Sequence, residues 1–315
     1  MNAKIIAAVL AALLVGGGLL YVYDDGRGTG TVSATADYAA IVCDPSMGSV
    51  VPVSFEYPDA VYRAVPADGY VFVRWTDADG TQLSADAELT VDLTARTTVT
   101  AVFAASSLTQ SYTYDFPVTF SSDAVATVQR TLTLTLSSTG YAASMAADTV
   151  RHAETDVRTP AYMVDPTDAG VKAVAAALTA ATDGYSDLER LTAVLYWVQT
   201  AIPYAYDSVL YGQAEWWAYP SECLYNMAGD CEDTAVLFCS IAEAMGFQVA
   251  LVAFDGHMGT AVVVDGVTGG QTYTADDATY TYCETAVDSA VGVGIISSQL
   301  ASAACTVVPI TGGSS

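Results

Sequence analysis

The sequence predicts an α+β fold in which a helix packs on an antiparallel sheet, preceded by a small all-β domain and an N-terminal transmembrane helix. Three observations support this prediction: an apolar run over residues 5–23, short alternating segments over 37–104, and helical periodicity with further strands over 105–310. We therefore expect a membrane anchor over 1–24, a stalk over 25–36, the all-β domain over 37–104 and the α+β domain over 105–310.

The chain is strongly acidic. Ten basic residues against thirty-five acidic ones give a formal net charge of -25 over 315 residues, and 52% of the residues are hydrophobic. The chain therefore has enough apolar material for packed cores, but no basic surface that could neutralise nucleic-acid phosphates. We expect no nucleic-acid partner. The acidity fits either a salt-rich setting or a soluble, self-repelling surface.

The predicted anchor is the apolar run over residues 5–23. As a helix this run would rise about 28 Å, close to the hydrocarbon thickness of a bilayer. Lys4 precedes the run, and Asp24 and Asp25 follow it. The positive-inside rule therefore places the N-terminus in the cytoplasm and the rest of the chain outside the cell membrane. The alternative is a cleaved signal peptide, but the small-residue triplet Ala-Thr-Ala occurs only later, at 34–36.

The all-β prediction depends on segments such as Gly69–Trp75 and Thr100–Phe103. They resemble the repeat modules of microbial surface proteins, which implies a spacer or adhesion unit, present here in one copy. The acidic run Asp77–Gly80, with Glu88 twelve positions in, partly matches a calcium loop. Its glycine falls at the fourth loop position instead of the sixth and strands flank it, so we expect a hairpin turn.

The second domain begins with strands over 109–150 and continues with two helices. The first helix begins near Pro166. The second begins at Ser186, where Glu189 completes a capping box, and ends at Ile202 because a proline follows. Both helices have an apolar face, which is typical of helices in a protein core.

The segment most informative about function places Cys231 at the start of a helix. Gly229 and Asp230 form a turn before it, and Gly246 ends the helix after an apolar face. A free thiol is only a few per cent thiolate at neutral pH, and the thiolate is the nucleophile. The partial positive charge at a helix start lowers a thiol pKa, so we expect an activated Cys231.

His257 is the candidate base, at the start of a strand that follows this helix. A neighbouring imidazolium would lower the thiol pKa further. Such a base needs an acceptor on its far nitrogen, which fixes the tautomer. Glu284, on the next strand along, is the favoured acceptor. Asp276 and Asp277 are the alternatives, although they are typical of the turn before that strand.

The remaining polar and cysteine residues near the site have structural interpretations. Glu232 and Asp233 would complement the helix dipole. The chain has no Cys-x-x-Cys pair and two histidines, so we expect no metal and no cofactor. Cys223 and Cys283 could form a disulfide in an oxidising location or merely be buried, and Cys239 is expected to be a small hydrophobic core residue. The six cysteines are Cys43, Cys223, Cys231, Cys239, Cys283 and Cys305.

The order of a cysteine on a helix, then a histidine and an acid on successive strands, resembles the papain-like core of the transglutaminase-like superfamily. The motifs Gly-Asp-Cys-Glu-Asp-Thr-Ala, Gly-His-Met and Tyr-Cys-Glu-Thr resemble those of its membrane-anchored members on archaeal cells. The resemblance covers roughly residues 105–300 and implies a triad of Cys231, His257 and Glu284. Members outside that subgroup usually have an aspartate as the third residue, so the role of Glu284 follows the archaeal subgroup.

The resemblance also implies the chemistry of the site. The oxyanion would be held by the Cys231 backbone N–H and an upstream indole or amide, for which Trp217 is favoured over Trp216 and Gln213. The expected function is acyl transfer, most simply as a protease or amidase that acts on surface or extracellular polypeptides. The alternatives are a crosslinking transglutaminase and a non-catalytic surface binding or adhesion module. The oligomeric state does not follow from the sequence.

Overall fold

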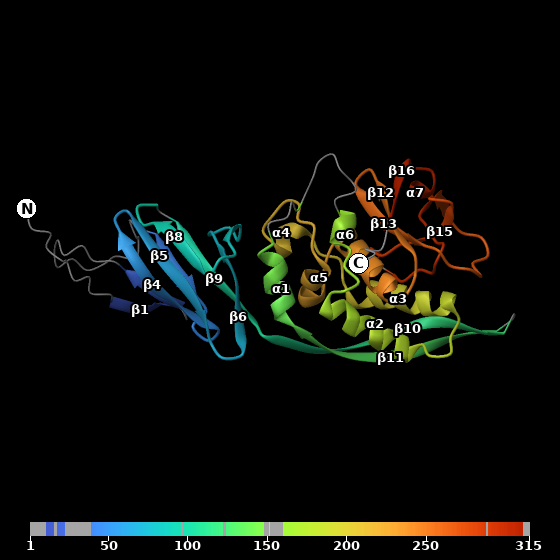
Figure 1. The fold of residues 1–315 in the computed structure, drawn as a ribbon, viewed down its shortest axis with the longest axis horizontal. Coiled ribbons are helices and arrows are strands. Elements are labelled where there is room, and N and C mark those ends of the chain that lie inside the picture. Colours follow the sequence, from blue (N-terminus) through green and yellow to red (C-terminus); the bar gives the residue numbers. More distant parts are fainter. Residues whose placement is uncertain are drawn as a thin grey trace, which may run out of the picture. The chain divides into compact units, whose positions relative to one another are not determined.

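The structure is a computed structural model that describes residues 11–15, 18–22, 39–95, 97–121, 124–147, 151, 160–287 and 289–310. The chain divides into two compact units. One comprises residues 1–107 with 145–147, and the other comprises 108–144 with 148–315 (Figure 1).

The N-terminal segment differs from the predicted anchor. Strands β1 (Ala11–Val15) and β2 (Gly18–Val22) pair in antiparallel register, where the sequence predicted a helix over 5–23. Three consecutive glycines at 16–18 explain the difference, because glycine is among the poorest helix formers and favours a reversal of the chain. No helix among the described residues is long and apolar enough to cross a bilayer. The stalk predicted over 25–36 lies outside the described residues.

The first unit is all-β, as predicted. One sheet has the strand order β3-β9-β6-β7 and the other has the order β4-β5-β8. The strands are β3 (Ala40–Cys43), β4 (Gly48–Glu56), β5 (Asp59–Pro66), β6 (Tyr70–Thr76), β7 (Gln82–Ser84), β8 (Glu88–Asp92) and β9 (Thr98–Ala105). The core includes the fully buried Trp75 and Ile41. The run Asp77–Gly80 is the hairpin turn between β6 and β7, and Asp77 Oδ1 accepts the Thr81 backbone N–H at 2.9 Å.

A long two-stranded ribbon, β10 (Ser107–Ser121) and β11 (Ala124–Ser137), comes next. Hydroxyl groups pair across it, for example Ser111 with Thr133 at 2.7 Å. The strands predicted over 109–150 are wrong beyond Ser137, because α1 (Ser138–Met145) is a helix. The two alanines in this segment favour a helix over a strand.

The second unit is built around one buried helix, α6 (Cys231–Ala244), and a five-stranded antiparallel sheet of order β14-β15-β13-β12-β16. The sheet strands are β12 (Val249–Phe254), β13 (His257–Val262), β14 (Thr272–Ala275), β15 (Ala278–Cys283) and β16 (Cys305–Pro309). The helices are η1 (Pro160–Met163), α2 (Ala169–Ala181), α3 (Asp187–Ala201), α4 (Asp207–Leu210), α5 (Pro220–Asn226) and α7 (Ser298–Ala301). Figure 1 shows α2 beside the ribbon strand β11.

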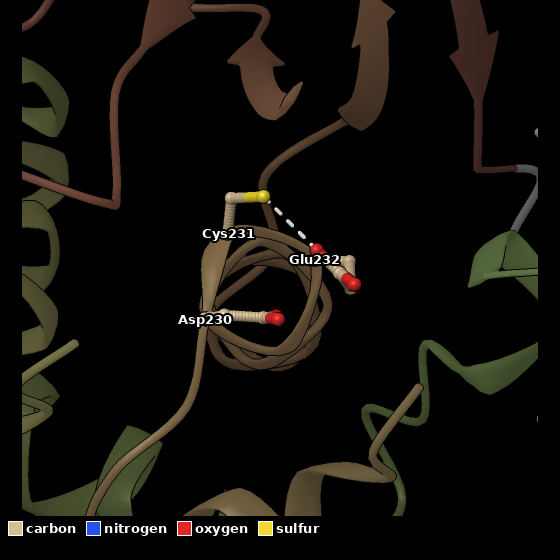
Figure 2. Close-up of side chains that lie close together, drawn as sticks. All are labelled: Asp230, Cys231 and Glu232. Atoms are coloured by element: carbon tan, nitrogen blue, oxygen red, sulfur yellow. Dashed lines mark hydrogen bonds between the residues drawn. The ribbon is translucent and has the colours of Figure 1, made fainter. Parts of the chain in front are cut away.

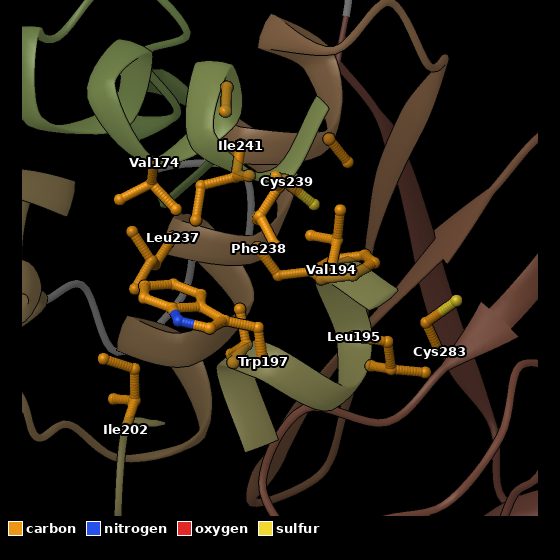
Figure 3. Close-up of a cluster of buried hydrophobic side chains, with 14 of the residues drawn as sticks. Val174, Val194, Leu195, Trp197, Ile202, Leu237, Phe238, Cys239, Ile241 and Cys283 are labelled. Carbon is orange, nitrogen blue, oxygen red and sulfur yellow. The ribbon is translucent and has the colours of Figure 1, made fainter. Parts of the chain in front are cut away.

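Helix α6 is buried on every side, since each residue from 232 to 242 is buried. It contacts α2, α3 and α5 as well as strands β12 and β13. In Figure 3, Val194 and Trp197 of α3 lie in one cluster with Leu237 and Phe238 of α6. The predicted capping box at Ser186 is confirmed and fixes the start of α3. A helix held this firmly gives its first residue a fixed position relative to the sheet.

Candidate active site

Cys231 is the first residue of α6, and Asp230 is the N-cap. The preceding Gly229 pairs with Tyr204 in a short parallel bridge. A Cβ atom on Gly229 would lie 2.6 Å from Cβ of Asp233, so only glycine allows the chain to pass this close to the helix. Cys231 is half-buried.

His257 and Glu284 form a hydrogen-bonded pair where β13 begins and β15 ends. His257 begins β13, and Glu284 directly follows β15, which pairs with β13. The imidazole Nε2 lies 3.0 Å from Oε2 and 3.2 Å from Oε1 of Glu284. The carboxylate therefore engages Nε2 and leaves Nδ1 as the nitrogen that can exchange a proton with a substrate or a thiol. The alternatives Asp276 and Asp277 form the turn between β14 and β15, both with positive φ.

The Glu284 carboxylate is itself held in place. It is 8% exposed; Tyr282 Oη donates to its Oε2 at 2.7 Å, and the Ala286 backbone N–H donates to its Oε1 at 3.2 Å. Its backbone carbonyl accepts Nε2 of Gln199, on α3, at 2.7 Å. These contacts fix the orientation of the carboxylate before any substrate arrives.

Tyr282 and Gln199 were missed in the sequence analysis. Tyr282 could have been found, because residues two apart on an extended chain point to the same side as each other. Gln199 could not have been found, since 85 residues separate it from Glu284.

The thiol of Cys231 bonds to a carboxylate that the sequence analysis assigned to the helix dipole. Sγ donates to Oε2 of Glu232 at 2.9 Å (Figure 2). The backbone N–H of Met258, the residue after His257, also lies within hydrogen-bond range of the thiol. Cys231 is thus beside the start of β13, but the described hydrogen bond of its thiol is to Glu232 and not to His257.

This arrangement raises the pKa of Cys231, where the sequence analysis expected a lowered one. Burial is the largest cause, followed by the negative charge and the hydrogen bond of Glu232, while the Met258 N–H lowers the thiol pKa. The charged form is disfavoured by desolvation and by a neighbouring carboxylate. At rest, Cys231 is therefore a thiol that needs a base, not a preformed thiolate.

The acids near the start of α6 are buried rather than solvated. Burial and the charge of Asp230 raise the pKa of Asp207 to about 7. Burial also raises the pKa of Asp233, which is 0% exposed. The expectation that Asp233 only complements the helix dipole is therefore incomplete, because its Oδ1 accepts the Ala218 backbone N–H at 2.8 Å.

The predicted oxyanion donors lie in the segment after α4. The indole N–H of Trp217 donates to Glu215 at 3.0 Å, and that of Trp216 donates to Glu222 at 3.1 Å. Each indole N–H already donates to a carboxylate, so neither is available to donate to an oxyanion in this structure. Gln213 is half-buried in the same segment. The backbone N–H of Cys231 stays the predicted oxyanion donor.

All six cysteines are free thiols in the structure. Cys223, Cys239 and Cys283 are 0% exposed, so of the two possibilities left open for Cys223 and Cys283, the structure has the buried thiol. Cys305 is half-buried, like Cys231. It lies on β16 and provides a reference thiol of the same burial class.

Two family models match parts of the chain. Residues 172–257 match the family model described as the transglutaminase-like superfamily, a span that begins in α2 and ends at His257. Residues 58–107 match the family described as the divergent InlB B-repeat domain. The chain therefore carries a transglutaminase-like segment that contains Cys231 and His257, while Glu284 lies beyond the matched residues. None of the curated proteins compared with the chain matches it.

Among solved structures, the chain is similar to a protein from Parabacteroides distasonis described as a "putative protease". The two share 11% sequence identity with a TM-score of 0.26. The match covers 70% of this chain and 56% of the other, so the chain spans little more than half the length of that protein.

Proposed function

We propose that this protein is a cysteine-nucleophile acyl-transfer enzyme that hydrolyses amide bonds in polypeptides. The observation that carries the proposal is the His257–Glu284 pair, in which Nε2 lies 3.0 Å from the carboxylate. The pair lies at the ends of β13 and β15, and Cys231 begins α6, which packs on β13. A nucleophile, a base and a group that orients the base are the three parts of this chemistry.

The reaction begins when the thiol turns from Glu232 toward His257. Nδ1 takes the thiol proton as Sγ attacks the carbonyl carbon of the scissile amide, and the negative oxygen is held by the Cys231 backbone N–H. His257 then gives its proton to the leaving amine, and a thioester remains on Cys231. Water attacks the thioester, His257 takes a proton from that water, and the acid leaves as the proton returns to Sγ. Glu284 stabilises the imidazolium in both halves.

The acceptor of the acyl group decides between hydrolysis and crosslinking. Water gives a protease or amidase, whereas a lysine amine gives an isopeptide bond. We favour water, which is the acceptor that the sequence-based expectation of a protease or amidase implies. An extracellular location, with surface polypeptides as substrates and the all-β unit as a spacer, stays a prediction from the sequence.

The test is product analysis of the purified full chain with a peptide mixture from a digested proteome, in water enriched in oxygen-18. Hydrolysis would place the heavy oxygen in new C-terminal carboxylates that mass spectrometry identifies. A labelled primary amine in the same reaction would instead appear on glutamine side chains if the enzyme crosslinks.

The variants separate catalysis from contamination. Cys231→Ala and His257→Ala should abolish the labelled products, and Cys305→Ala should leave them unchanged. Amine incorporation that depends on Cys231 would replace hydrolysis with crosslinking. If wild-type protein yields neither product, the enzyme proposal fails and a non-catalytic binding module is the better account.

A further inference from the structure

Three aspartates of the second unit meet near the start of α6. Asp207 begins α4, Asp230 is the N-cap of α6, and Asp233 lies in the first turn of α6. One carboxylate oxygen from each lies within 4.8 Å of the other two. They are only 3%, 8% and 0% exposed, respectively. Three carboxyl groups thus share one interior position, where water contributes little to their solvation.

Two of these carboxyl groups are fixed by the backbone of the segment after α4. The Trp216 N–H donates to Oδ2 of Asp207 at 2.6 Å, and the Ala218 N–H donates to Oδ1 of Asp233 at 2.8 Å. Each bond occupies one oxygen and fixes the orientation of the whole carboxyl group. The site therefore does not depend on mobile surface side chains.

One oxygen of each of the three groups lacks a hydrogen-bond partner. Oδ1 of Asp207, Oδ1 of Asp230 and Oδ2 of Asp233 are buried without a hydrogen bond. Among the ion pairs of the described residues, none involves any of the three. Buried carboxylate oxygens almost always have a donor or a cation beside them. These three carboxyl groups meet in one cluster, and each has a buried oxygen without a partner, which a positively charged partner would satisfy.

We propose that Asp207, Asp230 and Asp233 together bind one hard divalent cation, with calcium as the ion that fits best. The donors are all carboxylate oxygens, which suit calcium or magnesium rather than zinc. Calcium accepts several protein carboxylates around one ion and completes its shell with other oxygens, whereas magnesium keeps most of its water. The proposal departs from the sequence-based expectation of no metal, because the sequence does not show that Asp207 reaches α6.

The competing account is that protons, not a cation, neutralise the cluster. The test uses the full chain, treated with a chelator and then dialysed. Terbium serves as a luminescent calcium substitute. It can be excited through tryptophan, because the backbone N–H of Trp216 donates to Asp207 and Trp216 is therefore near the cluster. Calcium should displace terbium at equimolar or lower concentration, and magnesium should need a large excess. A high concentration of monovalent salt suppresses loose binding to the acidic surface.

Thermal unfolding gives a second readout that requires no activity. At about 100 times the dissociation constant, calcium should raise the Tm of the second unit by about 5–10 °C. Asp207→Asn and Asp233→Asn keep an oxygen that can accept the backbone N–H, so both should fold, and their Tm without cation should equal or exceed that of wild type.

The variants should lose the calcium-dependent rise and most of the terbium signal. Asp77→Asn, in the exposed hairpin turn of the first unit, is the matched control and should keep both. The proposal is overturned if calcium leaves the wild-type Tm unchanged, or if the Asn variants respond to calcium as wild type does. Asp230→Asn provides a third variant in case Asp207→Asn or Asp233→Asn misfolds, because the Asp230 side chain accepts no hydrogen bond from the segment after α4. It should also lose the response to calcium.

Discussion

Glu232 sets the protonation state of Cys231 at rest. Its carboxylate accepts the thiol proton at 2.9 Å, and together with burial it raises the thiol pKa. The sequence analysis expected a lowered pKa for Cys231, because it considered the helix dipole but not the carboxylate of Glu232, the next residue. In the proposed mechanism, His257 deprotonates this thiol during the attack.

Replacing Glu232 with glutamine should make Cys231 more acidic. Removal of the negative charge favours the thiolate, so the apparent pKa from iodoacetamide rates should fall by about one unit and the rate at neutral pH should rise about tenfold. The rates are measured by peptide mass spectrometry in chelator, with Cys305 in the same chain as the reference thiol. An unchanged pH profile would show that Glu232 does not control the thiol.

The negative charge of Glu284 should contribute more to kcat/KM than any single hydrogen bond that orients its carboxylate. Glu284→Gln removes the charge that stabilises the imidazolium, so we expect kcat/KM for peptide hydrolysis to fall by about 10²–10⁴. Tyr282→Phe removes only the 2.7 Å bond to Oε2 and should cost about threefold to tenfold. Equal losses in the two variants would contradict this ranking.

At the scale of elements, the close approach of β13 and β15 determines where His257 meets Glu284. Tyr282 of β15 pairs with Ala261 of β13, and its ring reaches Gly259, where a Cβ would lie 2.6 Å from Cε2 of the ring. The same ring donates its hydroxyl to Glu284. Glycine at 259 therefore positions the acid through Tyr282.

Gly259→Ala should displace the Tyr282 ring and weaken both the fold and the site. We expect a loss of about 1–3 kcal/mol in unfolding free energy, as for overpacked cores, with a fall in kcat/KM at least as large as that of Tyr282→Phe. Gly292→Ala is the control, because nothing lies within 4 Å of a Cβ there. Denaturant unfolding and peptide hydrolysis measure the two effects. A stable, fully active Gly259→Ala variant would contradict the positioning role.

Elements with strong local signals were predictable. The start of α3 was set by its capping box, and the start of α6 by the Gly229-Asp230 turn. The helix expected over 5–23 was wrong because hydropathy outweighed the three glycines at 16–18. Helix α1 was missed because its few residues continue the composition of the preceding strand. Boundaries of this kind depend on tertiary packing, which periodicity does not report.

At the scale of the whole molecule, one buried ion pair supports the second unit. Arg151 donates to Glu222 through both of its terminal nitrogens, at 2.8 and 3.2 Å, and its guanidinium lies 4.6 Å from the centre of the Trp216 ring. The two side chains are 6% and 0% exposed. This pair could not be predicted from the sequence, since 71 residues separate the two side chains.

Arg151→Ala should destabilise the second unit by about 3–5 kcal/mol, because it leaves Glu222 buried and unpaired. Asp187→Asn is the control. It breaks the exposed pair with Arg190, 2.8 Å long, and should cost less than about 1 kcal/mol. Denaturant unfolding followed by tryptophan fluorescence measures both, since the second unit contains Trp197, Trp216 and Trp217. Similar losses in the two variants would contradict the buried-pair account.

The site as a whole was only partly predictable. The sequence suggested Cys231, His257 and Glu284 because each lies next to a recognisable turn or strand. It did not reveal Glu232 as the partner of the thiol or Gln199 as a support of Glu284, because those contacts depend on side-chain direction and on the packing of α3 against the segment after β15.

The most direct test of the central claim is acylation of Cys231 by p-nitrophenyl acetate. We predict a burst of p-nitrophenolate equal to one equivalent of the full chain, with an acetyl group mapped to Cys231 by peptide mass spectrometry. The burst should vanish in Cys231→Ala, slow at least tenfold in His257→Ala and persist in Cys305→Ala. An acetyl group on other residues, or a burst that survives in Cys231→Ala, would contradict the claim that Cys231 is the nucleophile of an acyl-transfer enzyme.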